Sequence, residues 1–193
     1  MGVDVARFGD DETVLCFRRG RDARSIKPLR FKGKNTMDVA DEVAKAIERF
    51  KPDAVFVDGG GVGGGVVDRL HQLGYRVSEV QSGEKASDEE RYMNKRVEMW
   101  ALMREWLVYG AIDNNERLID DLTGPEYSVV LKGQLKLESK ESMKKRGLPS
   151  PNDGDALAHT FAAPVARLDS AVSRARNRMR GDTADSDYEI FGT

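Results

Sequence analysis

The chain has 193 residues, of which 39% are hydrophobic and 33% are charged, and its formal net charge is -2. This length and apolar content suit one domain with a tail. The near-neutral balance excludes a uniformly basic nucleic-acid-binding domain, so any contact with a polyanion must come from local clusters. Cys16 is the only cysteine, which excludes an internal disulfide and indicates a reducing compartment. Neither a signal peptide nor an apolar run of about 20 residues is present.

The first predicted elements are two short apolar strands, Gly2–Ala6 and Thr13–Arg18. A turn-rich loop joins them, which indicates a β-hairpin. A third strand is predicted at Ile26–Phe31. Thr36 is the predicted cap of a helix that extends to about Phe50, because apolar residues recur there at helical spacing.

A parallel strand and its crossover helices are predicted next. Ala54–Val57 is short and apolar, as expected of a buried parallel strand, and Asp58 ends it. The segment Gly59–Gly65 contains six glycines in seven residues and precedes a helix that Gly74 stops. Arg76–Val80 is predicted to be another strand.

The second half of the chain is predicted to be mostly helical, with an extra β-hairpin. Its predicted elements are, in chain order, a loop at Ser82–Glu90, a helix at Tyr92–Tyr109, a short helix at Leu118–Leu122, a hairpin of Tyr127–Leu131 and Gln134–Leu137, a basic segment at Ser139–Gly147 and a helix at Asp153–Val165. Residues 1–166 are predicted to form one domain, and residues 167–193 a flexible tail with few core residues. The element order predicts an α/β fold with one mixed β-sheet flanked by helices on both faces.

Three separated carboxylates are the candidate catalytic and metal-binding residues. Asp4 lies among apolar residues of the first strand, Asp58 ends a central strand, and Asp155 stands near the start of the last helix. A buried carboxylate is costly unless it is paired or metal-bound, and carboxylate oxygens are what Mg²⁺ and Mn²⁺ prefer. Two such ions about 3.5–4 Å apart could activate water for phosphodiester hydrolysis. Asp153 is a further candidate metal ligand.

Structural roles for these acids remain open at this point. Asp4 could pair with Arg7, Asp58 could cap its strand, and Asp153 and Asp155 could cap the last helix. His159 lies one helical turn after Asp155 and could face the same site, although a lone helical histidine is more often a satisfied core or surface residue.

The glycine run supports a competing interpretation. Gly59, Gly61 and Gly64 satisfy the pattern G-x-G-x-x-G between a strand and a helix, and Glu79 follows about 20 residues later. This is the pattern of a dinucleotide-binding domain. A hairpin before this strand counts against it, as does Asp58 beside the expected pyrophosphate. No Walker-type phosphate loop is present.

Basic residues that could bind DNA phosphates fall in two clusters, with Arg7 as a further single candidate. The candidates are Arg7 near the first acid, Lys95 and Arg96 at the start of the long helix, and Lys140, Lys144, Lys145 and Arg146 before the last helix. Such contacts give affinity without sequence choice. The alternative for each cluster is a solvated charged face.

Four stretches together resemble the C-terminal nuclease domain of large terminase subunits, which package DNA in tailed bacteriophages. They are GVDVARFGDDETV, VFVDGGGVGGGVVDRL, YMNKRVEMWALMREWL and ESKESMKKRGLPSPNDGDALAHTF. The resemblance implies an RNase H-like fold and an endonuclease that cuts concatemeric DNA with two Mg²⁺ or Mn²⁺ ions. By position, Asp4, Asp58 and Asp155 are then the metal-binding acids. The family often has S-P-D-R-A-D-A-L where this chain has Ser150–Leu157, so Asn152 replaces one acid and Asp153 could support the site.

The resemblance also implies partners. They are double-stranded DNA, an ATPase domain in the full-length protein, the portal and the small terminase subunit, in the cytoplasm of the infected host. Holliday-junction resolvases share the fold and acid layout, and are therefore the nearest enzymatic alternative. A non-catalytic alternative is a docking module that contacts a portal or capsid protein through residues 167–193.

Overall fold

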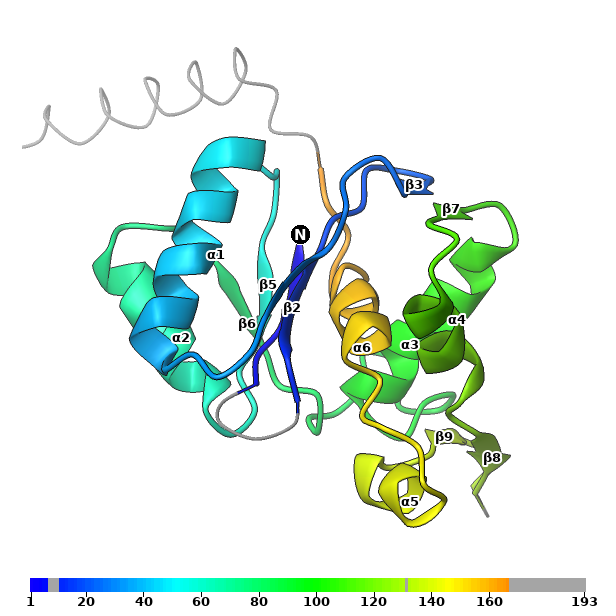
Figure 1. Cartoon of the computed structure of the whole chain (residues 1–193). Coiled ribbons are helices and arrows are strands. Elements are labelled where there is room, and N and C mark those ends of the chain that lie inside the picture. Colours follow the sequence, from blue (N-terminus) through cyan, green and yellow to red (C-terminus); the bar gives the residue numbers. More distant parts are fainter. Residues whose placement is uncertain (7–10, 131, 167–193) are drawn as a thin grey trace, which may run out of the picture.

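The molecule is a mixed β-sheet between two layers of helices (Figure 1). It is known from a computed structural model, which describes residues 1–6, 11–130 and 132–166. Arg7 and the predicted tail, residues 167–193, lie outside the described residues. No helix in the described part of the chain is long and apolar enough to cross a bilayer.

The main sheet has five short strands in the order β4-β2-β1-β5-β6. The strands are β1 (Gly2–Asp4), β2 (Thr13–Cys16), β4 (Leu29–Phe31), β5 (Phe56–Asp58) and β6 (Ser78–Val80). β2 pairs antiparallel with both β1 and β4, whereas β5 is parallel to both β1 and β6. This arrangement confirms the predicted opening hairpin and the mixed sheet, with β1 at its centre.

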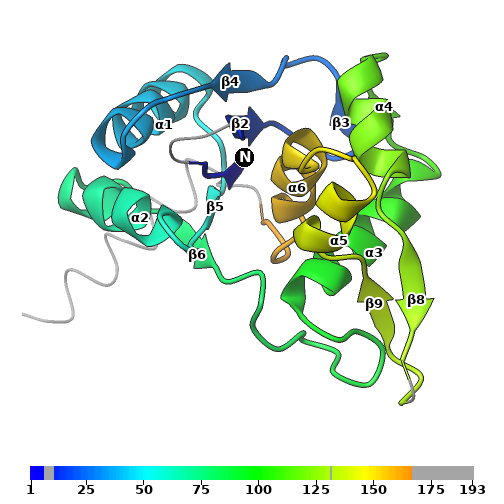
Figure 2. The ribbon, with the colours of Figure 1, turned by 60° about the horizontal axis from the view of Figure 1, so that its bottom comes forward.

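One face of the sheet is covered by α1 (Thr36–Phe50) and α2 (Gly63–Gln72), which lie side by side (Figure 2). The side chain of Asn35, rather than the predicted Thr36, caps α1, since Asn35 is extended and its side chain accepts the amide of Asp38. α2 starts inside the glycine run, three residues earlier than Val66, where the apolar pattern begins.

The opposite face is covered by α6 (Asn152–His159), with α3 (Lys95–Leu107) and α4 (Glu116–Thr123) behind it (Figure 1). α6 can approach β1 closely because Gly2 has no side chain. A Cβ atom there would lie 2.2 Å from the carbonyl oxygen of Ala156. α6 therefore rests directly on the central strand.

Smaller elements surround this sandwich. The predicted second hairpin is confirmed as β8 (Tyr127–Val129) and β9 (Leu135–Leu137). The basic segment after it contains a short helix, α5 (Lys140–Lys145), which the sequence did not predict because Met143 is its only buried residue. A parallel pair of two-residue strands, β3 (Asp22–Ala23) and β7 (Ala111–Ile112), was also missed, since such short strands carry no periodic signal.

Candidate metal centre

Two of the predicted acids end neighbouring parallel strands. β1 and β5 are in register, with Gly2 opposite Phe56 and Val3 opposite Val57. The next pair in this register is Asp4 and Asp58. Side chains alternate along a strand, so both carboxylates lie on the face that Gly2 presents to α6.

The third acid, Asp155, reaches the same region from α6 and is almost completely buried. Its Oδ1 accepts hydrogen bonds from Trp100 Nε1 at 2.7 Å and Arg96 Nε at 3.0 Å. Its Oδ2 pairs with Lys140 Nζ at 2.9 Å. Burial opposes ionisation, but Arg96 and Lys140 outweigh it and hold the pKa of Asp155 far below its ordinary value.

Lys140 connects Asp155 to Asp4. Its Nζ lies 3.7 Å from Asp4 Oδ1, and the two carboxylates raise the pKa of Lys140 against the opposing effect of burial. Burial raises the pKa of Asp4 to about 7, with Lys140 opposing the shift and Asp155 adding to it. One ammonium therefore does not fully compensate these charges, and further positive charge would stabilise the ionised form of Asp4.

Asp58 faces two residues that were not among the predicted site residues. His159 Nε2 lies 3.8 Å from Asp58 Oδ1, and Ser82 Oγ lies 3.4 Å from the same oxygen. Burial opposes ionisation of Asp58, but His159 outweighs it and lowers the pKa of Asp58. The i+4 spacing from Asp155 was the available signal for His159. Ser82 sits in a loop after β6, and sequence spacing gives no signal for it.

Asp153 does not join this cluster. Two residues along a helix turn the side chain by about 200°, so Asp153 and Asp155 point in nearly opposite directions. The Asp153 carboxylate instead pairs with Arg30 of β4, whose Nη2 lies 2.7 Å from Oδ1. Asp121 of α4 accepts the backbone amides of Asp153 and Gly154 and so caps α6 from another helix. These contacts give Asp153 a structural partner and leave Asp155 as the acid that faces β1.

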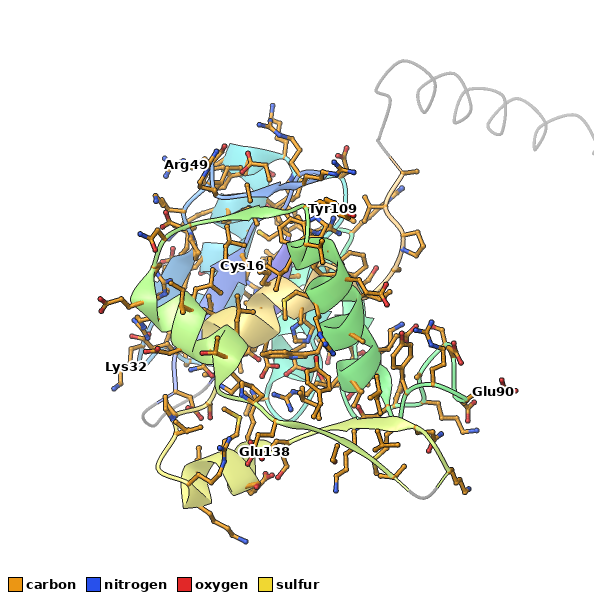
Figure 3. The ribbon with its side chains drawn as sticks, turned by 90° about the vertical axis from the view of Figure 1, so that its right-hand side faces the viewer. Cys16, Lys32, Arg49, Glu90, Tyr109 and Glu138 are labelled. Atoms are coloured by element: carbon orange, nitrogen blue, oxygen red, sulfur yellow. The ribbon has the colours of Figure 1, made fainter. Side chains whose placement is uncertain are left out.

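The basic candidates differ in what they contact. Arg96 and Lys140 bind the acids, as described above. Lys95 pairs with Glu98, and Arg146 pairs with Glu126 and Glu138. Glu138 lies next to the second hairpin (Figure 3). Lys144 is exposed on α5 and lies 3.5 Å from Asp11, and Lys145 beside it is also exposed. Among the described candidates, Lys144 and Lys145 are therefore the ones that present their charge outward, Lys144 with a 3.5 Å ion pair to Asp11 and Lys145 exposed beside it.

No family model and no curated protein matches the sequence. Solved structures do match. The nuclease domain of the large terminase subunit gp2 of bacterial virus Sf6 aligns with a TM-score of 0.72 at 21% identity, covering 84% of this chain and 87% of that one. The large terminase nuclease of thermophilic phage G20c aligns with a TM-score of 0.59 at 19% identity, covering 82% and 78%. The chain has the fold of a phage large-terminase nuclease domain.

This terminase-nuclease fold confirms the predicted RNase H-like architecture. A lysine-to-alanine mutant of the Sf6 domain has been solved with manganese and with calcium, and the G20c nuclease with cobalt and with magnesium. In the present chain, no group of three or more described His, Cys, Asp or Glu side chains converges tightly enough to hold an ion as arranged. The ammonium of Lys140 instead lies 3.7 Å from Asp4 and 2.9 Å from Asp155.

The donor chemistry nevertheless fits a divalent cation. Asp4, Asp58 and Asp155 offer hard oxygen ligands on one side of the sheet, and Asp4 is buried with its charge incompletely compensated. A divalent cation in place of the ammonium would carry twice its charge. It would therefore stabilise the ionised carboxylates more strongly than Lys140 does alone.

The glycine run serves this terminase-nuclease fold in a different way from a dinucleotide fingerprint. A Cβ at Gly63 would lie 1.8 Å from the carbonyl oxygen of Asp58, so glycine allows α2 to start directly against the end of β5. Glu79 packs over Gly59 and binds Gln81. The sheet is also mixed, whereas the dinucleotide-binding fold is mostly parallel. These observations argue against the dinucleotide alternative.

A large cavity lies at the other end of the sheet. Its volume is about 820 Å³, and its lining includes Met1, Arg18, Phe50 and Phe161. None of the three acids is among its lining residues. This cavity and the candidate metal centre are therefore separate features of this domain.

Proposed function

We propose that the chain is a metal-dependent endodeoxyribonuclease of a viral genome-packaging motor, which cuts concatemeric DNA by two-metal phosphodiester hydrolysis. The observation that supports this most is the placement of Asp4 and Asp58 at the ends of adjacent parallel strands, linked through Lys140 to Asp155, in a terminase-nuclease fold. Residues 1–166 would be the nuclease domain, and residues 167–193 a separate tail.

In the proposed reaction the metal ions supply the chemistry, and the protein side chains hold the ions in position. Two divalent ions, either Mg²⁺ or Mn²⁺, would supply an activated water and stabilise the leaving oxygen. Asp4, Asp58 and Asp155 would hold them. Arg96 keeps the Asp155 carboxylate ionised, and the hydrogen bonds from Arg96 and Trp100 fix its orientation. A fixed and ionised ligand reduces the reorganisation needed when an ion binds.

The basic residues would hold the DNA strand. Lys144 and Lys145 expose their charges on α5, one to two turns beyond Lys140. An ion that neutralises the acids would also free the Lys140 ammonium to contact a phosphate. Lys95 and Arg146, which are occupied by ion pairs, would contribute less to DNA affinity.

The proposed partners follow from the terminase likeness. They are double-stranded DNA, an ATPase domain in the full-length protein, and the portal and small terminase subunit, in the cytoplasm of the infected host. The tail, residues 167–193, would be the segment to delete in order to test docking to the portal.

The test is nicking of supercoiled plasmid DNA in Mg²⁺ or Mn²⁺. Asp58→Asn keeps the shape of the side chain but removes its charge, and should lower the cleavage rate at least about 100-fold. Asp68→Asn, on the exposed side of α2, is the matched control and should cut as the parent does. Equal cleavage by Asp58→Asn and the parent at equal purity would overturn the proposal. Preferential cutting of four-way junctions over linear duplex would favour a resolvase instead.

A further inference from the structure

His159 is one of only two histidines in the chain and is 2% exposed at the C-terminal end of α6. Its Nδ1 lies 2.7 Å from the backbone carbonyl oxygen of Asp155, one turn earlier in the same helix. A carbonyl oxygen can only accept a hydrogen bond, so Nδ1 carries a proton and donates it. The other ring nitrogen, Nε2, is therefore the atom that faces the candidate metal centre.

Nε2 points at groups that do not satisfy it well. Asp58 Oδ1 lies 3.8 Å away, and Ser82 Oγ lies 3.5 Å away, at the long limit for a hydrogen bond. In the neutral ring, the Nε2 lone pair would face a carboxylate with no positive charge between them. Such an arrangement deep in the protein requires a cation, which can be either a proton on Nε2 or a metal ion.

We propose that Nε2 of His159 is a fourth protein ligand of the candidate metal centre and binds the same ion as Asp58. The inference rests on the proposed function, because it presumes that an ion binds beside Asp58. Metal–ligand bonds of about 2.1 Å place adjacent ligand atoms about 3.0 Å apart and opposite ones about 4.2 Å apart. The observed 3.8 Å between Nε2 and Asp58 Oδ1 falls inside this span.

The orientation of the ring supports the assignment independently. Metal-binding histidines usually donate their second ring N–H to a carbonyl or carboxylate, which fixes the tautomer and aims the free nitrogen at the ion. Here that acceptor is the backbone of Asp155, which is itself a proposed metal ligand. One turn of α6 thus fixes the positions of two proposed ligands relative to each other.

The proposal has a consequence for metal choice. Imidazole nitrogen suits later transition metals such as Co²⁺, whereas Mg²⁺ and Ca²⁺, and to a lesser degree Mn²⁺, prefer oxygen ligands. With His159 as a ligand, the site should favour Co²⁺ over Mg²⁺. His159→Gln keeps a polar side chain of similar size, and should lower the affinity for Co²⁺ at least about 10-fold while changing that for Mg²⁺ much less.

A direct test uses the parent protein with ¹⁵N-labelled histidine and ¹¹³Cd²⁺ as the probe ion. Ligation predicts a one-bond ¹¹³Cd–¹⁵N coupling at Nε2 of His159. His71 is an internal control, because it is exposed on α2 and its Nε2 lies 3.1 Å from the carbonyl oxygen of Val77. The measurement needs no variant, so a folding defect cannot obscure it.

Calorimetric titration of Co²⁺ and Mg²⁺ completes the test, with His159→Gln compared with His71→Gln. A bound ¹¹³Cd resonance without coupling to His159, together with an unchanged Co²⁺-to-Mg²⁺ affinity ratio in His159→Gln, would overturn this inference and leave the proposed nuclease intact. Failure of the parent to bind any of these ions would overturn both. Coupling at His159 with a lowered ratio in the variant is the result expected.

Discussion

Replacing Lys140 with methionine removes the ammonium that lies between two buried acids and keeps most of the aliphatic side chain. Loss of one partner from a fully buried ion pair costs about 3–5 kcal/mol, because the remaining charge stays desolvated. The Lys140 side chain is 35% exposed, and its Nζ lies 2.9 Å from Asp155 and 3.7 Å from Asp4. Solvent screening at this exposure reduces the expected loss to about 2–3 kcal/mol.

Thermal unfolding followed by circular dichroism measures this loss. In a domain of this size, about 1 kcal/mol shifts the melting temperature by about 2–4 °C, so Lys140→Met should melt roughly 5–10 °C below the parent in EDTA. Added Mn²⁺ should then recover most of the loss, because an ion at 100 times its Kd stabilises by about 2.7 kcal/mol. The parent should respond less to Mn²⁺, because its own ammonium competes with the ion. Lys145→Met, an exposed position on the same helix, is the control.

Two results would refute this reasoning. If Lys140→Met melts at the parent temperature in EDTA, the ammonium does not compensate the buried acids. If the variant is destabilised but gains no more from Mn²⁺ than the parent does, the lysine and the ion do not compete for the same carboxylates.

Three further predictions concern the supports of the site. Gly2→Ala would place a methyl group 2.2 Å from the carbonyl oxygen of Ala156 and should destabilise the fold by about 1–3 kcal/mol and weaken Mn²⁺ binding, as measured by urea unfolding and calorimetry. Trp100→Phe removes the 2.7 Å hydrogen bond to Asp155 and should cost about 1.5–3 kcal/mol in the same unfolding assay. Burial raises the pKa of Asp121 from 3.8 to about 6, so its contribution to stability is complete below about pH 4 and is lost as the pH rises through about 6. Relative to Asp121→Asn, the parent should therefore lose about 1–2 kcal/mol of stability between pH 4 and pH 7, after allowance for solvent screening.

Each of these variants has a matched control. Gly83→Ala adds a methyl group in open space and should leave stability nearly unchanged. Trp106→Phe changes the other tryptophan, which donates to the carbonyl of Gly20, away from the acids. Asp120→Asn removes the charge of the exposed neighbour on α4 and is the control for the loss of a carboxylate from this helix. If any control shifts as much as its paired variant, the assigned contact is not the cause.

Much of the fold could be predicted because its main helices and strands show a regular spacing of apolar residues, or are bounded by residues that favour turns. The apolar spacing in α1 and the abrupt turn residues after β1 predicted both elements in the correct order. Boundaries were less predictable. The last helix was expected to reach Val165 but ends at His159, where the Thr160 hydroxyl binds the carbonyl of Leu157 and Pro164 follows closely.

The sequence predicts where the candidate acids lie along the strands and the last helix, and it does not predict which residues surround them. Asp4 and Asp58 interrupt or end apolar strands, which is visible in the sequence. Whether Asp153 or Asp155 faces β1 depends on the rotation of α6, which apolar spacing alone did not decide. That rotation is determined by tertiary contacts such as the pairing of Asp153 with Arg30, a residue 123 positions away in the chain.

Tertiary contacts also explain the basic residues. From the sequence alone all of them are candidates for DNA binding, whereas several of them form ion pairs with acids of the fold. A sequence shows that Lys95, Arg96, Lys140 and Arg146 are charged, but only the fold shows which acids they meet. The charged groups of Arg96 and Lys140 point toward the interior, because the buried carboxylate of Asp155 is stable in its ionised form only when it is paired with positive charge. Lys144 and Lys145 stay exposed, and Lys144 meets Asp11 rather than the buried acids.

The position of α6 therefore determines the geometry of the whole candidate centre. Gly2 lets the helix lie on β1, and Asp121 holds its first amides from another helix. From that fixed helix, the side chain of Asp155 and the ring of His159 are directed toward the acids that end β1 and β5. A small rotation of α6 would move both groups together and separate them from Asp58. The metal-binding competence of this domain should thus depend as much on the packing of α6 as on the carboxylates themselves.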